Sequence, residues 1–147
     1  MKIRKNMLPV LRPQGGNEEV KALKEVIESG WWGKGPKVAQ FEKEFAEMVG
    51  AKYAIAVTSN SHGQDLVMKA LDIRDGDVIN PTISFMATAM IPLWQPNVTT
   101  NIVDVDPITM CLDPEDVRKS ITPNTKAIIA VNQAGVPAPI KEIREFY

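Results

Sequence analysis

Apolar side chains recur at helical spacing in the first third of the chain. Val20, Leu23 and Ile27 fall at positions i, i+3 and i+7, which predicts a helix over residues 17–29. A second helix is predicted over residues 36–49, where a proline opens the first turn and one face is apolar. The apolar positions of that face are Val38, Phe41, Phe45, Met48 and Val49. The sequence therefore predicts two amphipathic helices in succession.

From residue 53 onward, short apolar runs alternate with helical patterns. The runs that predict strands are 53–57, 78–80, 99–105 and 126–131. The helices predicted between and after them cover about 61–71, 84–94, 114–121 and a stretch beginning after Pro139. Strands and helices that alternate at this spacing indicate βαβ units, so the fold class is α/β with a mostly parallel sheet.

Charged side chains of both signs are mixed along the chain, with 17 basic and 18 acidic residues and a net charge of −1. No basic stripe is present, so no nucleic-acid partner is expected.

Cys111 is the sole cysteine, which excludes an intramolecular disulfide and makes a reduced, cytoplasmic setting the expectation. The length of 147 residues and the hydrophobic content of 44% are typical of one packed domain.

The first 16 residues follow neither pattern and are expected to form an irregular segment ahead of one α/β domain over residues 17–147. Residues 1–10 are basic but contain no long apolar run, so a signal peptide is not expected. No uninterrupted apolar stretch approaches the roughly 18 residues that a membrane span requires. We therefore expect no membrane partner.

Small and polar residues follow three of the predicted strands, at 58–63, 80–84 and 132–135. Ligands of open α/β sheets bind at these carboxyl ends of the strands. At the first of them, the free amides of a helix start and the side chains of Ser59, Asn60 and Ser61 would form an anion pocket. A plain strand-to-helix turn capped by serine or asparagine is the alternative, and the residues alone leave both open.

Several other kinds of site have little support in the sequence. No GxGxxG or GxxxxGK[ST] motif follows a strand, which argues against dinucleotide and P-loop binding. His62 is the only histidine, and an exposed position in a first helical turn is its simplest interpretation. Asp104 and Asp106 would share one face of a strand, where a metal pair is conceivable, but an acid that begins the turn at Pro107 is the simpler interpretation. No metal site is predicted.

Residues 29–49 resemble the SGWxxxGPxVxxFExxFA segment of the DegT/DnrJ/EryC1/StrS aminotransferases. The similarity begins near Leu8 and continues, in order, through residues 53–71, 76–81, 85–89, 103–107 and 121–129. It implies a fold type I transferase that uses pyridoxal phosphate (PLP), with a three-layer α/β/α large domain. Residues 17–147 would be a truncated form of that domain, without its late strands and the small C-terminal domain.

The resemblance also implies cofactor-binding residues. Asn60 and Ser61 stand where the family's Gly-Thr pair holds the PLP phosphate, and serine retains the hydroxyl donor. Phe85 stands where the family places an aromatic ring against the pyridine face of PLP, a contact worth about 1 kcal/mol beyond burial.

Three further positions are implied as candidates for the substrate side and the dimer loop. Gly33 and Lys34 lie where a family loop borders the active site near the dimer interface, and Asn132 stands where many relatives have a histidine beside the cofactor. Departures occur next to both regions. Residues 62–65 read His-Gly-Gln-Asp where the family has roughly Ala-Ala-Leu-His, and residues 133–136 lack the expected aromatic-Gly-Gln pattern.

The family's acid that pairs with the pyridine nitrogen, and its Schiff-base lysine, would both fall beyond Tyr147. The implied function is therefore the N-terminal part of an enzyme that transfers an amino group, typically from glutamate, to a keto-sugar nucleotide. The chain alone is expected to be inactive, and no catalytic residue is assigned to it. Two alternatives stay open, a fragment of a PLP-dependent sugar dehydratase and a non-catalytic α/β domain that acts through self-association.

A homo-oligomer is also expected. In the family, the strand that corresponds to residues 53–57 pairs with a late strand, so in this chain it would lack its neighbour. The strand over residues 126–131 would form an open edge. Unpaired strands of this apolar kind recruit other chains.

Overall fold

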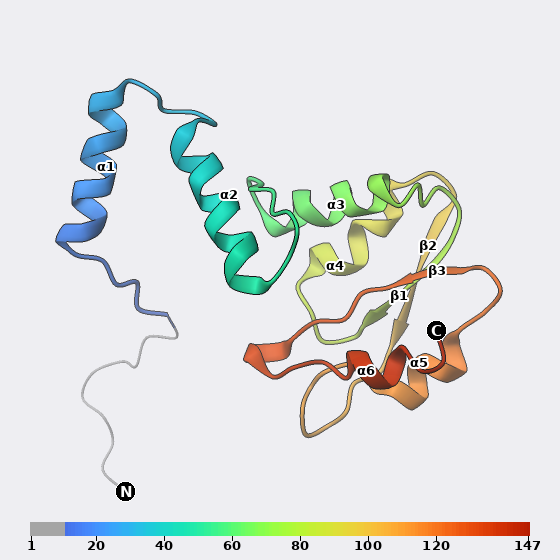
Figure 1. Cartoon of the computed structure of the whole chain (residues 1–147). Coiled ribbons are helices and arrows are strands. Elements are labelled where there is room, and N and C mark those ends of the chain that lie inside the picture. Colours follow the sequence, from blue (N-terminus) through green and yellow to red (C-terminus); the bar gives the residue numbers. More distant parts are fainter. Residues whose placement is uncertain (1–10) are drawn as a thin grey trace, which may run out of the picture. The chain divides into compact units, whose positions relative to one another are not determined.

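The computed structural model describes residues 11–147, and the chain divides into two compact units, Met1–Ala56 and Val57–Tyr147. Residues 1–10 of the predicted irregular segment lie outside the described residues. Residues 11–16 carry no helix or strand. Figure 1 labels the elements of both units along the chain.

The first unit contains the two predicted helices, α1 (Asn17–Ser29) and α2 (Pro36–Val49). The Glu19 carboxylate accepts a hydrogen bond of 2.6 Å from the Gly16 amide at the start of α1, and this bond lowers the pKa of Glu19. Gly30 ends α1 with a φ of 69°, a backbone conformation that suits glycine. Both helices that the apolar periodicity predicted are confirmed.

The predicted strand over residues 53–57 is absent, so this prediction is wrong. Tyr53 and Ile55 are 75% and 73% exposed rather than buried. The Ala56 amide donates to the Glu42 carboxylate of α2 at 2.9 Å instead of to a neighbouring strand. A strand exists only where another strand accepts its amide hydrogens, and within the described residues no strand pairs with this segment.

The second unit is built on a parallel sheet of three strands, β1 (Gly76–Pro81), β2 (Val98–Val103) and β3 (Thr125–Ile128), in the order β2-β1-β3. The central strand β1 pairs Ile79 with Asn101 of β2 on one side and with Ile128 of β3 on the other. The prediction of a mostly parallel α/β fold is confirmed. The strands β2 and β3 end earlier than their apolar patterns suggested.

Helical segments cover both faces of this sheet. The second unit contains α3 (Asn60–Ala70), α4 (Met86–Met90), η1 (Pro92–Trp94), α5 (Pro114–Ser120), η2 (Gln133–Gly135) and α6 (Ile140–Ile143). The predicted helix over 84–94 is divided into α4 and η1, because Pro92 has no amide hydrogen with which to continue α4. Figure 1 shows α3 and α4 on one side of the strands and α5 and α6 on the other.

Two adjacent residues of β1 divide the core between these faces. Val78 packs in a cluster formed with Met68, Ile73, Ile91 and Val98. Its neighbour Ile79 points the opposite way, into a cluster formed with Val103, Leu112, Val117 and Ile143. Both β1 side chains are fully buried, and the result is three layers with a core on each side of the sheet.

Asp106 has the turn role that was the simpler of its two interpretations. Its Oδ1 accepts hydrogen bonds from the Thr109 amide at 2.7 Å, the Thr109 hydroxyl at 2.9 Å and the Ile108 amide at 3.1 Å. These donors, the Thr109 amide foremost, hold the pKa of Asp106 below its usual range. Over residues 11–147 no cluster of three or more histidine, cysteine or acidic side chains could hold a metal.

No helix in the described part of the chain is both long enough and apolar enough to cross a bilayer.

Ile79→Ala tests the central position of β1. We expect it to lower the free energy of unfolding by about 2–5 kcal/mol, because it removes buried methyl groups and leaves a cavity between the sheet and α5. Ile108→Ala is the matched control, since Ile108 is 89% exposed and its loss should change stability by less than about 0.5 kcal/mol. Urea denaturation followed by circular dichroism measures both, and equal effects would contradict the assignment of the core.

Candidate functional site

The start of α3 presents unused hydrogen-bond donors. Ser59 precedes the helix in an extended conformation, and its Oγ accepts from the His62 amide at 3.3 Å. The Gly63 amide closes the first turn on the Ser59 carbonyl at 3.1 Å. Within the described residues, the amides of Asn60 and Ser61 and the hydroxyl of Ser61 donate no hydrogen bond. This 11-residue helix therefore directs free donors and the positive end of its dipole toward one point.

A groove of about 490 Å³ lies beside this helix start. It is lined by Val57, by Asn60, Gly63, Gln64, Val67 and Met68 of α3, and by Ile128, Ile129 and Ala130 at the end of β3. Its volume falls in the range of about 300–1,000 Å³ that is common for small-molecule sites. Gly63 keeps the mouth of the groove free of a side chain.

Gln64 adds a buried acceptor to the same groove. Its Nε2 donates to the Asn60 Oδ1 at 2.5 Å, while its Oε1 is shielded from solvent and has no hydrogen-bond partner within the described residues. A buried acceptor without a donor is costly, so this atom favours a ligand or a further chain segment that donates to it. The donor set at the helix start suits a phosphorylated molecule.

His62 lies in the first turn of α3, as the sequence indicated, and its contacts could not be read from the sequence. Its Nδ1 is 2.9 Å from the Ser59 Oγ and 3.0 Å from the Thr58 Oγ1. The imidazole therefore lies within hydrogen-bonding distance of both hydroxyl groups that precede the helix.

Phe85 and Asn132 do not line this groove. Phe85 directly precedes α4, after the end of β1, and its ring is exposed. The Asn132 Oδ1 accepts a hydrogen bond of 2.9 Å from the Ala138 amide, so this side chain closes the loop that follows β3. The structure brings Asn60 and Ser61 together at one helix end, and Phe85 and Asn132 follow the ends of two neighbouring strands of the same sheet.

Gly33 and Lys34 belong to the first unit, in the loop between α1 and α2. Gly33 borders a groove of about 460 Å³ whose other lining residues include Trp31 and Trp32. The Trp31 Nε1 donates to the Lys34 carbonyl at 2.9 Å, and the Lys34 Nζ lies 3.5 Å from the Glu42 carboxylate. A Cβ atom at Gly35 would come within 2.1 Å of the Trp31 ring, so the loop requires glycine there.

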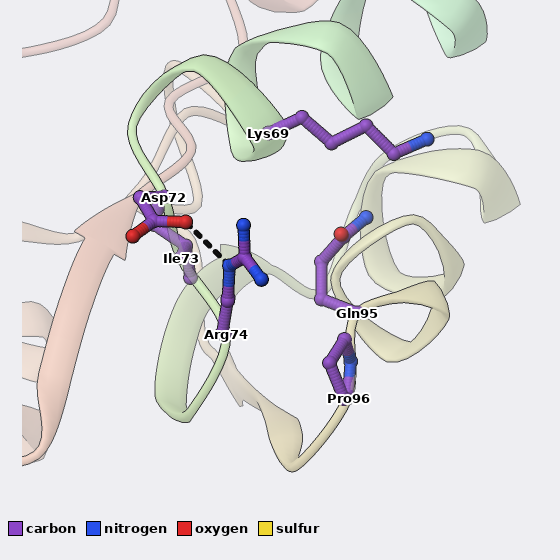
Figure 2. A pocket seen from close by; sticks show the side chains of 6 residues that line it. All are labelled: Lys69, Asp72, Ile73, Arg74, Gln95 and Pro96. Carbon is purple, nitrogen blue, oxygen red and sulfur yellow. Dashed lines mark hydrogen bonds and ion pairs between the residues drawn. The ribbon is translucent and has the colours of Figure 1, made fainter.

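Another pocket of the second unit, of about 340 Å³, is lined by Lys69, Asp72, Ile73, Arg74, Gln95 and Pro96. Figure 2 shows the Arg74 guanidinium beside the Gln95 side chain, with Lys69 extending above them. The charges here are already paired, because Arg74 bonds to Asp72 and Lys69 bonds to Asp65. The Gln95 Nε2 also donates to Asp65, at 2.9 Å. This hydrogen bond connects α3 to the segment between η1 and β2, so the polar groups of the pocket have a structural role.

The comparisons with known proteins agree with the motif series in the sequence. The profile of the DegT/DnrJ/EryC1/StrS aminotransferase family matches residues 13–147. A solved 3-amino-5-hydroxybenzoic acid synthase is 35% identical over 91% of this chain, with a TM-score of 0.86. The E. coli GDP-4-keto-6-deoxy-D-mannose-3-dehydratase, solved with bound hydrated PLP, is 31% identical over 94% of this chain, with a TM-score of 0.87. An aminotransferase from Psychrobacter cryohalolentis is 32% identical over 91% of this chain, with a TM-score of 0.83.

The chain spans about a third of each of these structures, namely 35%, 37% and 34% of their lengths. The family profile, in contrast, covers nearly all of this chain, and the predicted resemblance is confirmed. The chain belongs to the DegT/DnrJ/EryC1/StrS aminotransferase family.

Proposed function

We propose that this chain forms the N-terminal part of the large domain of a PLP-dependent enzyme that transfers an amino group to a keto-sugar nucleotide. Within it, the start of α3 would hold the phosphate of the cofactor. The observation that carries the proposal is the set of free donors at Asn60 and Ser61, at the head of a helix and beside a groove of suitable volume. The PLP bound in the E. coli relative supports the choice of cofactor.

The donors have distinct tasks in this proposal. The amides of Asn60 and Ser61 and the Ser61 hydroxyl would donate to phosphate oxygens, and the exposed ring of Phe85 would stack on the pyridine. When bound, PLP supplies the electron sink for amino transfer. Asn132 and the Gly33–Lys34 loop are proposed for the substrate side, the latter near a subunit interface.

The acid for the pyridine nitrogen and the lysine that binds PLP covalently would come from the part of the fold that these 147 residues do not cover. A keto-sugar nucleotide as acceptor and glutamate as donor are proposed from the family.

A cytoplasmic location is proposed from Cys111, a buried free thiol.

A sugar dehydratase is the second candidate, because the E. coli relative is a dehydratase at 31% identity, close to the 32% of the Psychrobacter aminotransferase. The residue at the position where an aminotransferase has the lysine that binds PLP covalently would discriminate an aminotransferase from a dehydratase. A non-catalytic domain that acts through self-association is the third candidate.

The chain of 147 residues should show no amino transfer when mixed with PLP, glutamate and keto-sugar nucleotides, because the lysine and the acid on the ring nitrogen are required for the chemistry. Mass spectrometry of the sugar nucleotide measures the product, with a full-length family aminotransferase as the positive control. Turnover that survives complete removal of host enzymes would show that this expectation is wrong.

Inorganic phosphate should shift the backbone amide resonances of Asn60 and Ser61 in an NMR titration. Ser61→Ala should weaken this binding by about tenfold to a hundredfold, because a hydrogen bond to a charged group contributes about 1.5–3 kcal/mol. Ser120→Ala, at the far end of α5, is the matched control and should leave the affinity unchanged. Phosphate bound reproducibly elsewhere, with the turn before α3 unaffected, would contradict the proposed cradle.

We further propose that the chain self-associates, because β3 lies at a sheet edge and the apolar residues 53–57 are unpaired. A stable interface should bury at least about 1,000 Å². Ile55→Lys should shift the assembly toward monomer in light scattering at micromolar concentrations. Ile108→Lys, at a residue that is also exposed and lies outside both segments, should not. A monomer for the unmodified chain over that concentration range would rule out this association.

A further inference from the structure

The imidazole of His62 occupies an unusual position at the proposed phosphate site. It is the only histidine of the chain. Its Nδ1 lies within 3.0 Å of two hydroxyl oxygens, those of Thr58 and Ser59, which directly precede the free amides of Asn60 and Ser61. A single ring atom therefore lies within hydrogen-bonding distance of both hydroxyl groups next to the helix start.

Whether Nδ1 carries a hydrogen decides whether it donates to or accepts from the hydroxyl groups. When Nδ1 carries no hydrogen, it accepts one from a hydroxyl group, most directly from Ser59 at 2.9 Å. The Ser59 Oγ already accepts from the His62 amide, so this hydroxyl is then fully engaged inside the turn. When Nδ1 is protonated, it donates to a hydroxyl oxygen instead, and the hydroxyl hydrogen that it would have accepted is released to donate outward.

The other charged groups near His62 are few. Asp65, one turn later on α3, is held by Lys69 at 2.6 Å and by Gln95 at 2.9 Å. Lys69 is thereby paired with Asp65, so its charge is already compensated. On the β3 side, the groove presents Ile128, Ile129 and Ala130, which do not titrate. An arriving dianion would thus be the dominant new charge beside the ring.

We propose that His62 is a positioning residue of the phosphate cradle and that it takes up a proton when a dianion binds at Asn60 and Ser61. The protonated ring adds a positive charge and frees for the anion the hydroxyl hydrogen that Nδ1 would otherwise accept, most directly that of Ser59. The proton moves from solvent to Nδ1, and no covalent bond changes. This inference rests on the proposed function, because it concerns the same anion site.

The test is an NMR titration of the 147-residue chain with sulfate, which stays a dianion over the whole pH range used. Titrations at about pH 5.5 and about pH 8 lie on either side of the ordinary histidine range. We expect sulfate to bind at the Asn60 and Ser61 amides about tenfold more tightly at the lower pH, the change that a one-unit linkage to a single proton produces. The imidazole signals should show that sulfate keeps the ring protonated to higher pH.

His62→Gln should bind sulfate with nearly the same affinity at both pH values, and His62→Asn provides a second neutral variant in case the first perturbs the turn. Asp65→Asn is the matched control, which should preserve the pH dependence if the proton belongs to His62. Equal affinity at both pH values in the unmodified chain, with shifts at Asn60 and Ser61, would overturn the role of His62 and leave the cradle intact. The absence of any shift at these two amides would overturn the cradle and this inference together.

Discussion

Backbone hydrogen bonding between parallel strands is the constraint on which the second unit depends. In the described part of the chain, β1 is the strand with partners on both sides, and its buried Val78 and Ile79 anchor the two halves of the core. Because the three strands run in parallel, their carboxyl ends meet at one edge of the sheet. The loops that carry Phe85 and Asn132 begin at this edge. The same constraint leaves residues 53–57, which have no strand neighbour, in an irregular conformation.

The sequence predicted the local elements well where the cause was itself local. The helix predicted over 114–121 follows Asp113 and begins with a proline, and the Asp113 Oδ1 caps it by accepting from the Glu115 amide at 2.8 Å. The run 53–57 has the composition of a strand, but composition does not provide the neighbouring strand that pairing requires. The spatial order β2-β1-β3 differs from the chain order and depends on packing over long sequence separations, which no local pattern encodes.

A similar division applies to the site. Small polar residues between an apolar run and a helix left two interpretations open over residues 58–63, an anion pocket and a plain capped turn. The structure shows Ser59 as the cap of α3 and leaves the amides of Asn60 and Ser61 free within the described residues. The side-chain contacts of His62 and the unpaired Oε1 of Gln64 depend on rotamers and on burial in the folded chain, so the sequence could not predict them. It did mark residues 62–65 as a departure from the family pattern, and both features lie inside that departure.

The proposed phosphate cradle differs in kind from the rest of a PLP site. Its donors and the neighbouring hydroxyl groups lie within residues 58–61, at the start of α3. This helix is fixed to the sheet by its buried Met68, which packs in the same core cluster as Val78. Covalent attachment and ring-nitrogen protonation instead need groups from distant segments of a fold that is about three times longer. A local helix start can retain anion affinity without those segments, because its free energy comes from adjacent amides and the helix dipole. In the proposed function, the phosphate cradle is therefore the part of the PLP site whose groups all lie within residues 58–61.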